Sequence, residues 1–171
     1  MEAIFIAIRT FLEAGGGVLY LIAGATFFMW ALIFERLWFI KTEHKTDVGN
    51  ALSYWEGRPE RTSWNAHRIR ERMISEVNGR LNANMPFIKT LISLLPLLGL
   101  LGTVTGMVQV FEAMTYAGGN ARSMAAGVSM ATIPTMAGMV ATLAGVLANT
   151  YIVSMVDSES RFLEDTLTMD H

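Results

Sequence analysis

The chain contains no cysteine, and three long stretches of it contain no charged residue. Without cysteine, neither a disulfide framework nor a metal site built on thiolates is possible. His44 and His67 lie in a hydrophilic stretch and His171 ends the chain, so no cluster of histidines or carboxylates has the spacing of a metal or catalytic site. We therefore expect no enzyme and no metal or other cofactor. The net charge of −2 also argues against a nucleic-acid partner.

The charge-free stretches cover residues 14–34, 90–111 and 123–156 and explain a chain that is 52% hydrophobic and only 16% charged. About 20 apolar residues form a helix that crosses the bilayer, and one charge at its centre costs roughly 2.5–3.5 kcal/mol. We therefore predict an all-α integral membrane protein with transmembrane helices over residues 14–40, 90–114 and 123–156. The first stretch lacks the basic start and cleavage site of a secretory signal peptide.

Basic residues are distributed unevenly about these helices. Ten Lys and Arg lie between the first and second charge-free stretches, whereas Arg122 stands alone in the second connection and Arg9 alone before the first stretch. Since cytoplasmic loops carry the excess of Lys and Arg, residues 41–89 are predicted to be a cytoplasmic helical loop. Residues 1–13 then form an interfacial helix on the outer side, residues 115–122 an outer loop, and residues 157–171 a cytoplasmic helical tail.

Within the cytoplasmic segments, the pattern predicts a short helix capped by Thr46 or Asp47 and ended by Gly57. A second helix follows Pro59, with an apolar stripe at Ile69, Met73, Val77 and Leu81. The third apolar run continues as one helix to Leu167. Its acidic end, at Asp157, Glu159, Glu164 and Asp165, either pairs with the Arg-rich loop helix or is merely solvated.

The second and third transmembrane helices carry hydroxyl groups among small residues. Two interpretations remain open: the hydroxyls and glycines serve helix packing, or the threonines line a solvated ion pathway. The predicted pathway residues are Thr103, Thr135, Thr132 and Thr142. The predicted packing residues, with prolines that loosen the backbone, are Gly99, Gly102, Gly106, Pro96, Pro134, Gly138 and Gly145.

The segment GLLGTVTGM, from Gly99 to Met107, and the segment GVSMATIPTMAG, from Gly127 to Gly138, resemble the ExbB, TolQ and MotA proton-channel family. Three spans and a short outer loop are more similar to ExbB or TolQ than to the four-span MotA. The length is similar to short ExbB proteins of second TonB-type systems.

The resemblance implies a pentameric ring in the bacterial inner membrane, with a periplasmic N-terminus and a cytoplasmic C-terminus. A single-span ExbD-type partner would supply a membrane Asp, and a TonB-like protein would receive the work for outer-membrane transport. The lumen threonines would fall on Thr103 and Thr135. A TolQ-like envelope motor and a nonconducting membrane scaffold are the alternatives.

One departure from the family concerns the outer start of the third helix, where many members have Glu and this chain has Met130. Glu112 is interpreted as a subunit contact or, alternatively, as a substitute proton site. None of the charge-free runs contains a titratable Asp, Glu, His, Lys or Arg. If the protein conducts protons, we expect another chain to supply the proton-carrying group. The sequence does not decide between protons and sodium ions.

Overall fold

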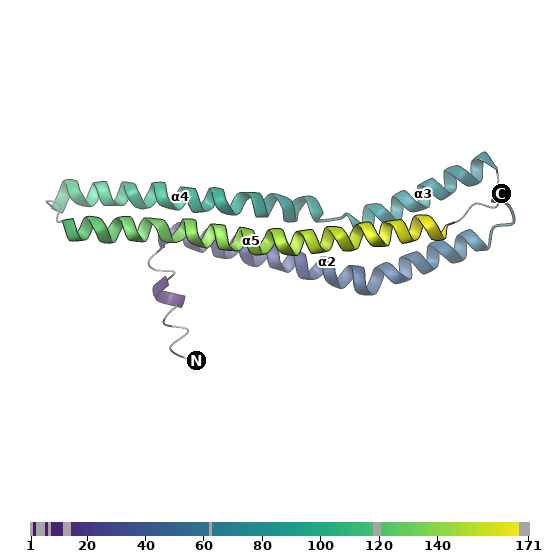
Figure 1. Ribbon diagram of the computed structural model, residues 1–171, viewed down its shortest axis with the longest axis horizontal. Helices are drawn as coiled ribbons and strands as arrows, with labels where there is room; N and C mark the ends of the chain where they lie inside the picture. Colours follow the sequence, from purple (N-terminus) through teal and green to yellow (C-terminus); the bar gives the residue numbers. More distant parts are fainter. Residues whose placement is uncertain are drawn as a thin grey trace. The chain divides into compact units, whose positions relative to one another are not determined.

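A computed structural model describes residues 2, 6, 8–11, 15–61, 63–117 and 121–167. Four helices account for nearly all of this (Figure 1): α2 (Gly16–Glu56), α3 (Trp64–Leu81), α4 (Met85–Ala117) and α5 (Ala121–Thr166). Most of the interfacial helix expected over residues 1–13, and residues 118–120 of the predicted outer loop, lie outside the described residues.

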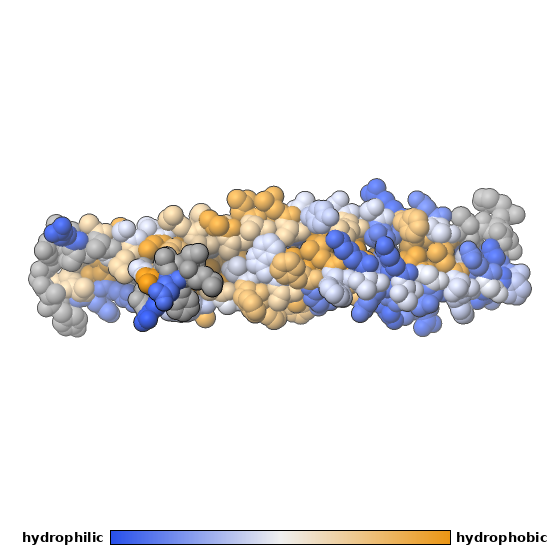
Figure 2. Space-filling view, turned by 90° about the horizontal axis from the view of Figure 1, so that it is seen from below, coloured by the Kyte–Doolittle hydropathy of each residue, from blue (hydrophilic) through white to orange (hydrophobic). Residues whose placement is uncertain are grey.

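The chain divides into two compact units, each with its own core. We call Met1–Trp30 with Lys89–Leu147 the apolar unit, and Ala31–Ile88 with Ala148–His171 the polar unit. Hydrophilic side chains gather over the polar unit, on the right in Figure 2.

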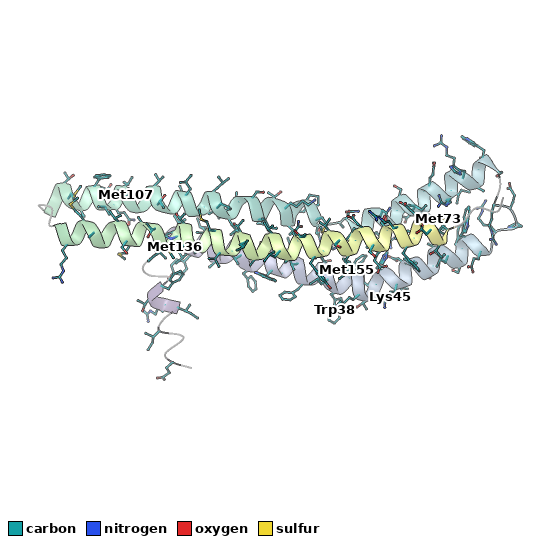
Figure 3. All side chains as sticks on the ribbon, viewed as in Figure 1. Trp38, Lys45, Met73, Met107, Met136 and Met155 are labelled. Carbon is teal, nitrogen blue, oxygen red and sulfur yellow. The ribbon has the colours of Figure 1, made fainter. Side chains whose placement is uncertain are left out.

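Three helices of the described chain are long and apolar enough to cross a membrane, which confirms the predicted all-α fold with three candidate spans. The apolar unit displays large apolar side chains that a water-soluble surface of this size would avoid. Among them are Phe27, Leu97, Val140 and Leu143, each more than half exposed. Met136 likewise projects from α5 (Figure 3). Lipid or other protein chains therefore have to cover this surface.

In the polar unit, α2 does not begin anew at Thr46 or Asp47, so the predicted short helix is wrong at its start. The buried positions Ile40, His44 and Val48 follow one another at helical spacing through the expected boundary. Packing of this stripe holds the helix together, and the Asp47 carboxylate accepts a hydrogen bond from Arg80 instead of capping a helix. The predicted end is right, because α2 stops at Glu56, directly before Gly57. Trp38 and Lys45 project outward from the same helix (Figure 3).

Helix α3 begins at its cap, Ser63, whose hydroxyl accepts a hydrogen bond from the Ala66 amide at 3.2 Å. Of the predicted stripe, Val77 and Leu81 are buried, together with Ala66. Asn84 then turns the chain with a positive φ of 63°, a conformation that Asn tolerates better than most residues.

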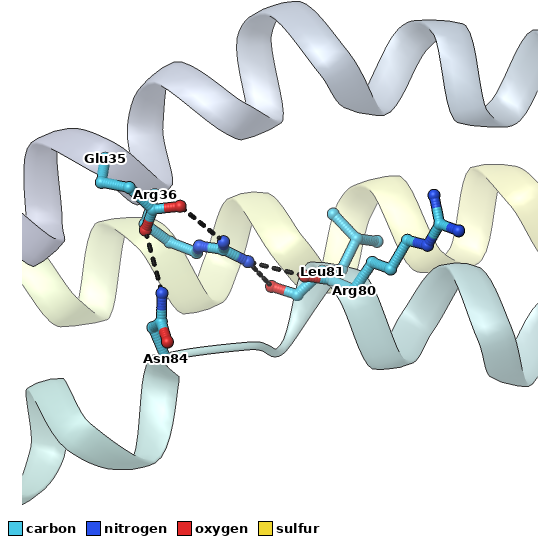
Figure 4. A network of polar contacts seen from close by, with 5 residues as sticks. All are labelled: Glu35, Arg36, Arg80, Leu81 and Asn84. Atoms are coloured by element: carbon cyan, nitrogen blue, oxygen red, sulfur yellow. Dashed lines mark hydrogen bonds and ion pairs between the residues drawn. The ribbon is translucent and has the colours of Figure 1, made fainter.

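A buried charge, Arg36, holds this turn in place (Figure 4). Its guanidinium donates to the carbonyls of Arg80 at 2.6 Å and Leu81 at 3.3 Å, and it pairs with Glu35 at 3.0 Å. Glu35 also accepts a hydrogen bond from the Asn84 amide at 3.2 Å. The last carbonyls of α3, which have no partner within their own helix, are therefore satisfied by a cation of α2.

The acidic end of α5 does contact α3, but through its backbone. Arg70 donates to the carbonyls of Leu167 at 2.5 Å and Glu164 at 2.8 Å. The carboxylate of Glu159 lies 3.4 Å from the buried ring of His44 on α2. Helix-end carbonyls attract cations, and Arg70 of the Arg-rich loop helix contacts the end of α5 through two such carbonyls.

Candidate functional site: the contact between α4 and α5

Glycines allow α4 and α5 of the apolar unit to approach each other closely. A β-carbon on Gly138 would lie 2.7 Å from the Leu95 carbonyl oxygen, and one on Gly99 would lie 3.0 Å from the Thr135 α-carbon. A β-carbon on Gly102 would likewise collide with Pro134, and one on Gly106 with Ala131. Side chains at these positions would force the two helices apart.

Gly145 packs at a different place, where its added β-carbon would meet the sulfur of Met29 at 2.7 Å and Ile92 at 2.9 Å. It therefore brings α5 against α2 and α4 together. All five predicted packing glycines thus lie where α4 and α5 meet, and Gly145, about two turns after Gly138, also packs against α2.

Thr135 connects the two helices through its hydroxyl, which donates to the Gly99 carbonyl at 3.0 Å. In an α-helix that carbonyl is also the acceptor for the amide four residues on, which is the amide of Thr103. The Thr135 hydroxyl is therefore within one turn of the Thr103 backbone. The structure brings together these two threonines, which the sequence placed on different helices.

Thr142 likewise lies near a carbonyl of α4, one that has lost its helical hydrogen-bond donor to a proline. Pro96 has no N–H, so the Ile92 carbonyl lacks its normal helical donor. The Thr142 hydroxyl lies 3.5 Å from this oxygen, at the limit of a hydrogen bond, and donates more closely to Gly138 of its own helix at 2.7 Å. A small polar group is thereby available where the α4 ladder is interrupted.

The other two predicted pathway threonines bond within their own helices. Thr103 donates to the Leu100 carbonyl at 2.7 Å and is partly exposed. Thr132 donates to the Ser129 carbonyl at 2.7 Å and is exposed. Hydroxyls bonded in this way keep their oxygen free to accept, so both can still meet water or a second chain.

Glu112 and Met130 are both exposed on the apolar unit. Among the residues that the structure describes, no three His, Asp or Glu side chains converge as metal ligands would.

Two polar residues escaped the sequence interpretation. Arg36 was counted only as a flanking charge, although its position directly after a charge-free run, next to Glu35, indicates a cation drawn into the interior. Gln109 is an amide within the second charge-free run, four residues after Thr105 and hence on its face of the helix. That isolation among apolar residues was the available signal.

The geometry defines a class: a multi-span helical membrane protein in which two glycine-rich helices are joined by the Thr135 hydroxyl and carry long runs without Asp, Glu, His, Lys or Arg. Residues 40–165 match the model of the MotA/TolQ/ExbB proton channel family. The chain belongs to that family, and this confirms the resemblance found in its two glycine-rich segments.

A curated relative from Synechocystis sp. (strain PCC 6803), named as a biopolymer transport protein ExbB-like 1, is 38% identical over 80 residues. The match covers 44% of this chain and 32% of that protein. The chain thus spans about a third of the length of this relative.

Proposed function

We propose that the protein is an ExbB-like subunit of a proton-driven motor in the bacterial inner membrane. It assembles as a pentamer whose lumen is lined by α4 and α5 and receives an ExbD-type partner with a membrane Asp. The motor passes work to a TonB-like protein for outer-membrane transport, such as uptake of an iron chelate. A TolQ-like role in envelope maintenance uses the same subunit chemistry.

One observation carries the proposal: the Thr135 hydroxyl donates to the Gly99 carbonyl between two helices whose charge-free runs hold no Asp, Glu, His, Lys or Arg. A hydroxyl both donates and accepts hydrogen bonds but does not ionise at neutral pH. It can therefore order water around a proton carrier without trapping the proton. The carrier has to come from another chain, and this is the reason for the proposed partner Asp.

Native mass spectrometry of the detergent-purified protein, expressed alone and with its chromosomal neighbours, tests the assembly. We expect a five-subunit ring that takes up a single-span partner carrying a membrane Asp. A stable monomer or dimer that retains no such partner would remove the lumen, and with it the roles of Thr103 and Thr135.

Substitution of Thr135 tests the pathway itself. Thr135→Val keeps the shape of the side chain and removes the hydroxyl, which is worth about 0.6–1.7 kcal/mol between membrane helices. We expect the ring to assemble and energised transport to be lost. Thr135→Ser is the matched control, because it retains the hydroxyl, and should keep most of the activity.

A nonconducting scaffold is the second candidate, and it is favoured by the fact that Thr135 and Thr142 both direct their hydroxyls at backbone carbonyls. Under this alternative, Thr135→Val would weaken assembly and transport in parallel. Normal assembly with lost transport would argue against it.

A further inference from the structure

The apolar unit contains a cavity of about 260 Å³ between the start of α2 and the outer halves of α4 and α5. Gly15–Val18 cover one side of it, Gly102, Thr105 and Gln109 line it from α4, and Gly127 and Met130 line it from α5. Gly16 and Gly17 leave space on the α2 side, because no atom lies within 4 Å of a β-carbon built on either residue. One water molecule needs on the order of 10–15 Å³, so several would fit.

Gln109 gives the cavity a strongly polar wall. Its side chain is exposed in the single chain and forms no hydrogen bond with any residue that the structure describes, although the amide can make up to four. An amide without a partner in hydrocarbon costs roughly 2–7 kcal/mol. A residue with this cost inside a membrane helix requires water or another polar partner beside it.

Two further residues of the cavity lining, Thr105 and Met130, carry polar groups of interest. The Thr105 hydroxyl donates to its own helix, at 3.0 Å to Leu101 and 3.1 Å to Gly102, and keeps its oxygen free to accept. Met130 lines the cavity, and its carbonyl lacks the usual donor four residues on because that residue is Pro134. A buried water typically needs two to four polar partners, and the side chains of Gln109 and Thr105 both belong to the lining of this cavity.

We propose that this cavity is filled with water and forms the approach by which protons reach Thr103 and Thr135 from the end of the bundle where α4 connects to α5. Gly102 lines its inner end and precedes Thr103 in sequence, while Ala131 on the facing wall lies about one turn before Thr135. The cavity therefore reaches within one helical turn of both threonines. The route, though not the water, depends on the motor proposed above.

The absence of cysteine makes the water content directly measurable. In membranes that contain the whole assembly, a single cysteine at Gln109 (Gln109→Cys) is treated with a charged, membrane-impermeant methanethiosulfonate reagent. The cysteine thiolate attacks the reagent's sulfur, forms a mixed disulfide and displaces methanesulfinate, and an apolar environment suppresses formation of the thiolate. Val108→Cys and Phe111→Cys are the matched controls. Both side chains are exposed, both lie within two residues of Gln109 along α4 and hence at nearly its depth in the membrane, and neither lines the cavity.

We expect Gln109→Cys to react about tenfold faster than both controls, or more. Equal rates at the three positions would mean that depth alone sets the reactivity, and this result would overturn the proposal of a water-filled cavity. The labelling rate does not depend on proton flow, so failure of the motor proposal would leave it unchanged.

The proton route has its own test in cells that depend on energised transport. Gln109→Leu removes the polar wall and should lower transport severalfold while the ring still assembles. Gln109→Asn retains the amide and should keep most of the transport. Unchanged transport in Gln109→Leu, or equal losses in both variants, would overturn the route even if the cavity proves to hold water.

Discussion

At the scale of single residues, Gly138 and Arg36 make opposite demands on the side chain. Gly138 has no room for one, whereas the position of Arg36 depends on a long charged one. The β-carbon position of Gly138 lies 2.7 Å from the Leu95 carbonyl oxygen and 3.3 Å from the Gly99 α-carbon. Both neighbours are backbone atoms and cannot rotate away. Any substitution must therefore move a whole helix.

We predict that Gly138→Ala lowers the free energy of unfolding by about 1–3 kcal/mol through overpacking. Gly24→Ala on α2 is the control, because nothing lies within 4 Å of its β-carbon position. Both substitutions raise helix propensity by about 1 kcal/mol, so their difference isolates the collision. Thermal unfolding in detergent, followed by circular dichroism, measures it. Equal midpoints would show that α4 and α5 are not in close contact at Gly138.

Arg36 is only 3% exposed, and its guanidinium also lies 4.6 Å from the centre of the Phe39 ring. Hydrogen bonds to a charged group contribute about 1.5–3 kcal/mol. Arg36→Ala would leave the carbonyls of Arg80 and Leu81 without this donor, so we expect a loss of about 2–4 kcal/mol in unfolding free energy. Lys41→Ala, at an exposed position of the same helix, should change it by less than about 0.5 kcal/mol. Similar unfolding midpoints for the two variants would contradict the role of Arg36.

At the scale of elements, the continuous helix α2 departs most from the sequence interpretation, and it gives a sharp test. Proline at residue 46 inside a helix would clash with the carbonyl four residues earlier and cost about 3 kcal/mol. At the start of a new helix the same proline would cost little. We therefore expect Thr46→Pro to destabilise the protein strongly and Thr46→Ala to be nearly neutral, since Thr46 is exposed. If Thr46→Pro left the thermal unfolding midpoint unchanged, a separate helix beginning at Thr46 or Asp47 would again be the better interpretation.

The three spans, the stripe of α3 and the extension of α5 were predictable because hydrophobic periodicity reports burial directly. The run through Thr46 was not, since an exposed Thr followed by Asp satisfies local capping rules while the buried stripe of Ile40, His44 and Val48 decides the outcome. For the site, glycine spacing predicted close contact. The partner of the Thr135 hydroxyl could not be predicted from the sequence, because it depends on the register of α4 against α5, and Gly99 lies 36 residues away in the chain.

At the scale of the whole molecule, charge is separated along the chain: the charge-free runs lie mainly in the apolar unit, and most Lys and Arg lie in the polar unit. Proteins with this distribution insert so that the Lys- and Arg-rich loop stays in the cytoplasm. The prediction that follows concerns α4. Glu60 precedes it and Thr115 lies near its end, and both are exposed.

Glu60 lies before α3 and Thr115 near the end of α4, so a single cysteine at each position locates the two sides of this segment in a chain that has no other cysteine. In intact cells whose outer membrane admits small molecules, a membrane-impermeant maleimide should label Thr115→Cys. It should label Glu60→Cys only after the inner membrane is opened. The reverse pattern would invert the proposed orientation and place the water-filled cavity on the cytoplasmic side. Labelling of both in intact cells would mean that α4 does not cross the bilayer, because a single crossing has to put its two ends in different compartments.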